Sequence, residues 1–71
     1  MAHPFSKLFD AALRKSTPED NVLLKEAELL RAKGYSVEEI HGVLLKMQQG
    51  LVRDQDQEVA QEAAEEISRY L

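Results

Sequence analysis

The sequence predicts an all-α fold, a small bundle of four short helices in a single domain of residues 1–71. Three observations predict it. Apolar residues recur at helical spacing in four segments, and no segment alternates apolar and polar residues as a strand does. Only three glycines and two prolines interrupt the 71 residues. Because the chain has no cysteine for disulfides or thiolate metal sites, its stability depends on helix packing or on self-association.

The first helix is predicted at about residues 4–15. Its apolar residues have the spacing of one buried stripe, which lays this helix across the other three. The stripe consists of Phe5, Leu8, Phe9, Ala12 and Leu13.

The second helix is predicted at about residues 18–33. Thr17 is placed as its N-cap and Pro18 fits the first helical position. Gly34 suits a left-handed cap at the other end. We expect its apolar cluster to be Leu23, Ala27 and Leu30, with Val22 and Leu29 beside it and Leu24 pointing elsewhere.

The third helix is predicted at residues 37–49 and the fourth at about 54–70. Ser36 and Glu39 form a capping box before the third, and Gly50 ends it. Its expected buried stripe is Val37, Ile40, Val43, Leu44 and Met47. The apolar residues of the fourth share an arc of about 140°, namely Val59, Ala60, Ala63, Ala64, Ile67, Tyr70 and Leu71.

The opposite side of the fourth helix is acidic, and we call it the acidic ridge: Asp54, Glu58, Glu62, Glu65 and Glu66. Residues 54–71 carry six acidic side chains and one basic one, a net charge of −5, whereas residues 1–53 carry seven acidic and eight basic ones, a net charge of +1. Like charges four residues apart disfavour a helix, although a Glu65–Arg69 pair offsets part of this. The ridge therefore predicts a docking surface for a basic protein or a mimic of nucleic-acid phosphates, with a purely solubilising face as the alternative.

Two leucines fall off the predicted stripes of adjacent helices. Leu24 points away from the apolar cluster of the second helix, and Leu45 lies nearly opposite the buried side of the third. A pair of this kind in so small a chain predicts a homodimer face.

The segment around Gly34 and Ser36 also begins as many helix-turn-helix segments do. A DNA reader needs a basic footprint on the following helix. Here that helix exposes mainly Glu38, Glu39, His41, Lys46, Gln48 and Gln49. A small DNA-binding regulator is therefore the rival hypothesis, although the net charge of −4 disfavours nucleic acid.

The sequence lacks the residue patterns of metal sites, phosphate-binding loops and membrane spans. Two histidines without helical metal-ligand spacing build no metal centre, and the three glycines are interpreted as isolated helix stops rather than a phosphate loop. We expect no enzyme and no cofactor. No apolar run approaches the roughly 20 residues of a membrane span, and residues 1–15 do not resemble a signal peptide. The expectation is a small, acidic, cytoplasmic module that binds another protein through a helix face.

Overall fold

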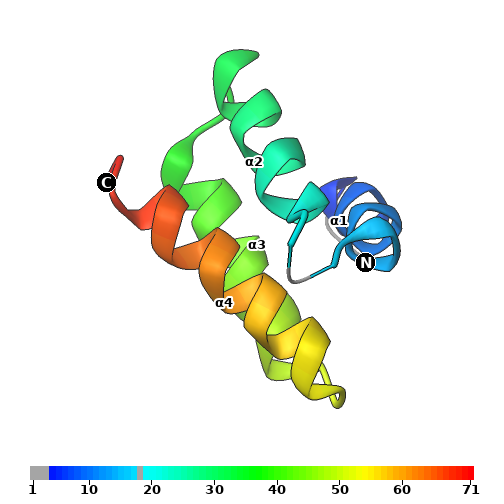
Figure 1. Ribbon diagram of the computed structural model, residues 1–71. Coiled ribbons are helices and arrows are strands. Elements are labelled where there is room, and N and C mark those ends of the chain that lie inside the picture. Colours follow the sequence, from blue (N-terminus) through cyan, green and yellow to red (C-terminus); the bar gives the residue numbers. More distant parts are fainter. Residues whose placement is uncertain (1–3, 18) are drawn as a thin grey trace.

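The computed structural model describes residues 4–17 and 19–71, and these form four helices and no strand. The helices are α1 (Pro4–Lys15), α2 (Val22–Ala32), α3 (Val37–Gln49) and α4 (Asp54–Ser68). Helices α3 and α4 run antiparallel as a hairpin, α2 lies across one side of it, and α1 packs mainly on α2 (Figure 1). The predicted all-α bundle of four short helices is confirmed.

The core receives side chains from all four helices. Its largest fully buried members are Phe9, Leu23, Ile40, Leu44, Val59 and Ile67. On α4, Ala60, Ala63 and Ala64 are buried as well. Because alanine side chains let helix axes approach closely, α4 packs against both α2 and α3. The predicted alanine-rich apolar face of α4 is confirmed from Val59 to Ile67.

The expected stripes are wrong for four other residues, which are about half exposed or more: Leu8, Leu29, Tyr70 and Leu71. Leu71, like Tyr70, lies past the end of α4. Helical spacing predicts on which side of a helix a side chain lies, but not how deeply that turn of the helix is buried. Leu8 lies on α1, which packs mainly on α2. Leu29 lies in the last turn of α2, the end that extends past α4 in Figure 1. Tyr70 follows the end of α4 and is covered by a cation, since its ring centroid lies 3.9 Å from the Arg31 guanidinium carbon.

Helix α2 begins at Val22, four residues later than predicted, with Asn21 as its N-cap. Thr17 uses its hydroxyl for a tight turn instead: Oγ1 accepts the Asp20 amide at 3.0 Å, and the two backbones exchange hydrogen bonds of 2.9 and 3.1 Å. Asn21 Oδ1 then accepts the Leu24 amide at 2.9 Å. The predicted role of Pro18 lies outside the described residues.

Ser16 connects α1 to the start of α2. Its hydroxyl donates to the Ala12 carbonyl at 2.9 Å and accepts the Leu23 amide at 3.0 Å, and the residue is 6% exposed. An amide in the first turn of a helix has no intrahelical partner. Ser16 thus satisfies a buried donor of α2 from the end of α1.

The turn between α2 and α3 forms as predicted. Gly34 has a φ of +102°, which a left-handed cap requires. Its amide donates to Arg31 O at 3.0 Å and that of Tyr35 to Leu30 O at 3.2 Å, the two bonds of a Schellman motif. Ser36 Oγ accepts the Glu39 amide at 3.5 Å as the N-cap of α3.

Candidate interaction surfaces

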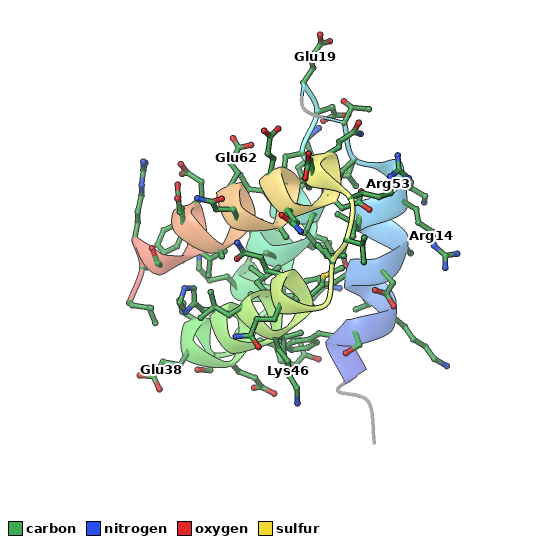
Figure 2. The ribbon with its side chains drawn as sticks, turned by 90° about the horizontal axis from the view of Figure 1, so that it is seen from below. Arg14, Glu19, Glu38, Lys46, Arg53 and Glu62 are labelled. Atoms are coloured by element: carbon green, nitrogen blue, oxygen red, sulfur yellow. The ribbon has the colours of Figure 1, made fainter. Side chains whose placement is uncertain are left out.

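The acidic ridge lies along the solvent side of α4. Four of its members, Asp54, Glu58, Glu62 and Glu65, are exposed, and Glu66 is half-buried. Figure 2 shows Glu62 projecting from α4 away from the body of the molecule. The orientation follows from the alanine face, which holds the opposite side of the helix against α2 and α3. The ridge is therefore displayed on a helix that the core immobilises.

Few protein groups compensate the charge of the ridge. Glu66 pairs with Arg69 at 3.3 Å, which corrects the expected Glu65–Arg69 pair: Arg69 lies just past the end of α4. Glu65 accepts instead from Gln61 Nε2 at 3.1 Å, and Glu62 accepts from Asn21 Nδ2 at 3.4 Å. Both donors are neutral amides. Among the described residues, Glu66 is the ridge carboxylate that forms an ion pair with a side chain.

The two leucines of the predicted dimer face have different surroundings. Leu45 is 42% exposed on α3. Leu24 is half-buried and packs against the core, at the end of α2 that is hydrogen-bonded to Ser16 after α1 and to Val59 of α4. The dimer face stays a prediction, and Leu45 is the member whose side chain is available to a second molecule.

The exposed side of α3, which we call the outer face of α3, consists of Glu38, Gly42, Leu45, Lys46 and Gln49. Gly42 corrects the interpretation that all three glycines stop helices, since it lies in the middle of α3. A recognition helix presents its first turns to the DNA major groove. In α3 those turns expose Glu38 and Glu39, whose charges repel phosphate. His41 is half-buried at the edge of this face.

A shallow cleft of about 440 Å³ lies where the end of α1 meets the start of α4. Its lining residues are Asp10, Leu13, Arg14, Ser16, Arg53, Gln55 and Asp56. Two guanidinium groups and two carboxylates balance one another, so the cleft favours neither anions nor cations. The sequence carries no signal for this juxtaposition, because Arg14 and Arg53 are far apart along the chain and neither belongs to a motif.

No helix within residues 4–17 and 19–71 has the length and hydropathy to cross a membrane. In the same residues, no three histidine or carboxylate side chains gather where they could hold a metal ion.

Comparison with known proteins adds no relative: no protein-family model, no curated protein and no solved structure matches the chain significantly.

Proposed function

We propose that this protein is a small non-enzymatic interaction module that binds a basic surface of another protein through the acidic ridge of α4. The proposal rests on the exposure of the ridge carboxylates and on how few of them form ion pairs. Asp54, Glu58, Glu62 and Glu65 are exposed and have no ion pair with a described side chain. A partner with lysine or arginine side chains would supply the missing cations.

The geometry of α4 suits such a partner. Successive ridge residues four positions apart lie about 6 Å apart along the helix axis, and the ridge extends over about 18 Å. Because Ala60, Ala63 and Ala64 anchor the helix in the core, little backbone conformational entropy is lost when the carboxylate row binds a partner. A row of one charge also accelerates encounter with an opposite charge, an effect that salt weakens.

The test replaces Glu58, Glu62 and Glu65 by glutamine and measures capture of partners from the native cell, identified by mass spectrometry. We expect the wild-type protein to retain a basic protein at low salt and to release it at about 0.5 M salt, where screening is strong. The ridge variant should retain none of it. The three substitutions also remove like-charge pairs, so they should not destabilise α4.

A matched control carries Asp10→Asn, Glu19→Gln and Glu28→Gln, which change the net charge by the same amount at exposed positions outside α4. It should bind as the wild type does. Equal retention by all three proteins, or equal loss in both variants, would overturn the proposal. Displacement of the partner by duplex DNA would identify it as a nucleic-acid-binding protein and favour phosphate mimicry. Salt-dependent retention of the purified wild type on a DNA column would favour the rival regulator hypothesis instead.

A further inference from the structure

Gly42 is a glycine that the fold of the monomer does not require. It lies in the middle of α3 and is exposed. Apart from its chain neighbours and the backbone of its own helix, a Cβ at this position would meet no described atom within 4 Å, and positive φ values among the described glycines are confined to Gly34. Glycine in a helix interior is less stable than alanine, and its usual benefit is close approach of another backbone. Within the described residues, no other segment of the chain brings its backbone close to Gly42.

Gly42 lies midway between two oppositely charged residues of α3. Glu38 lies four residues before Gly42 and Lys46 lies four residues after it. Both are exposed on the outer face of α3, and Figure 2 shows them projecting on the side of the molecule opposite Glu62. Leu45 adds an exposed apolar side chain within one turn of Gly42.

We propose that two copies of this chain associate through the outer face of α3, with their α3 helices antiparallel and crossing at Gly42. In an antiparallel pair centred on one residue, positions equally far before and after it face each other. Each Glu38 then faces Lys46 of the second copy, so one rotation creates two ion pairs. The absence of a side chain at Gly42 lets the two backbones approach, and Leu45 covers the backbone beside the crossing.

The charge pattern selects a second copy over an unrelated partner. The chain as a whole is acidic, with a net charge of −4, yet Glu38 and Lys46 balance each other on this face. A basic partner would find far more negative charge on α4. The crossing of single helices buries less than the roughly 1,200 Å² of a standard interface. The association is therefore weak, with a dissociation constant on the order of 100 µM.

The first test uses charge reversal and mixing, followed by sedimentation equilibrium from about 10 µM to about 1 mM. Glu38→Lys alone places lysine opposite lysine twice, and Lys46→Glu alone places glutamate opposite glutamate twice. Each variant should associate at least about tenfold more weakly than the wild type. An equimolar mixture of the two variants restores both opposite-charge pairs and should form heterodimers. A wild type that stays monomeric over this range would overturn the proposal, and so would a mixture no stronger than its components.

The second test adds a side chain at the crossing without harming the helix. Gly42→Gln should raise the melting temperature of the monomer, because glutamine favours helix, and should lower the association constant by at least about tenfold. Gly50→Gln is the matched control, since Gly50 lies at the end of α3 and outside its outer face. It should associate as the wild type does. Unchanged association of Gly42→Gln would rule out the crossing. The ridge lies on the other side of the molecule, so the docking and association experiments fail independently.

Discussion

The two connections that flank α2 are built in different ways. The turn after α2 uses hydrogen bonds among near neighbours, from Leu30 to Glu39. The junction before α2 relies on more distant partners. Ser16 joins Ala12 to Leu23, and Asn21 Nδ2 donates to the Val59 carbonyl of α4 at 3.0 Å, 38 residues away.

This difference explains why one connection was predicted and the other was not. Gly34 and Ser36 act on amides and carbonyls within a few residues of themselves, so their identities alone indicate the turn. Thr17 and Asn21 are both good N-caps by residue type. Asn21 is the cap in the structure, and its amide nitrogen also reaches α4. A choice that depends on tertiary contacts has no local signal.

The largest effect is expected at Ser16. Ser16→Ala leaves the Leu23 amide buried without its acceptor and removes the bond to Ala12, which should cost about 2 kcal/mol of unfolding free energy. Chemical denaturation followed by circular dichroism at 222 nm, the usual helix signal, measures it. For a domain of this size, the melting temperature should fall by roughly 10 °C.

Ser68→Ala is the matched control for Ser16→Ala. Ser68 Oγ also donates to a backbone carbonyl, that of Glu65 at 2.6 Å, but in an exposed position. Its loss should cost less than about 0.5 kcal/mol, because water replaces the partner. Similar losses in both variants would mean that Ser16 does not connect α1 to α2 in the way described.

The distinction between local signals and tertiary contacts also decides which features of the candidate surfaces could be predicted. The ridge follows from helical spacing on one helix, and four of its five members are exposed on α4. The partial burial of Leu24 and the exposure of Leu29 depend on how α2 packs against α1 and α4, which helical spacing does not encode. Gly42 carries a local signal of its own: a glycine six residues after a capping serine cannot be the stop of a helix that continues to Gln49.

A smaller effect is expected at Gly34, where the turn depends on backbone conformation. Apart from its chain neighbours, the methyl group of Gly34→Ala meets no described atom within 4 Å, so its cost comes from the φ of +102°. We expect a loss of about 1 kcal/mol in the free energy of unfolding. Gly42→Ala makes the same chemical change at a helical position and should instead gain about 0.5 kcal/mol.

Both glycine variants are measured by denaturation at low micromolar concentration, where self-association does not contribute to stability. Opposite signs at the two positions are the expected outcome. A neutral Gly34→Ala would show that the turn tolerates another conformation and that its hydrogen bonds do not define the end of α2.

The smallest effect isolates the distant contact of Asn21. Serine can cap α2 as asparagine does, but it has no amide nitrogen to donate to Val59 O. The Val59 carbonyl lies inside α4 and keeps its helical partner, so Asn21→Ser should cost only about 0.5 kcal/mol. Asn21→Ala loses the cap as well and should cost about 1.5 kcal/mol by the same denaturation measurement. The gap between the variants is the contribution of the cap, and the cost of Asn21→Ser is that of the contact with α4. If Asn21→Ser is as stable as the wild type, the contact with α4 adds nothing to stability, and the local N-cap hydrogen bond alone accounts for the start of α2.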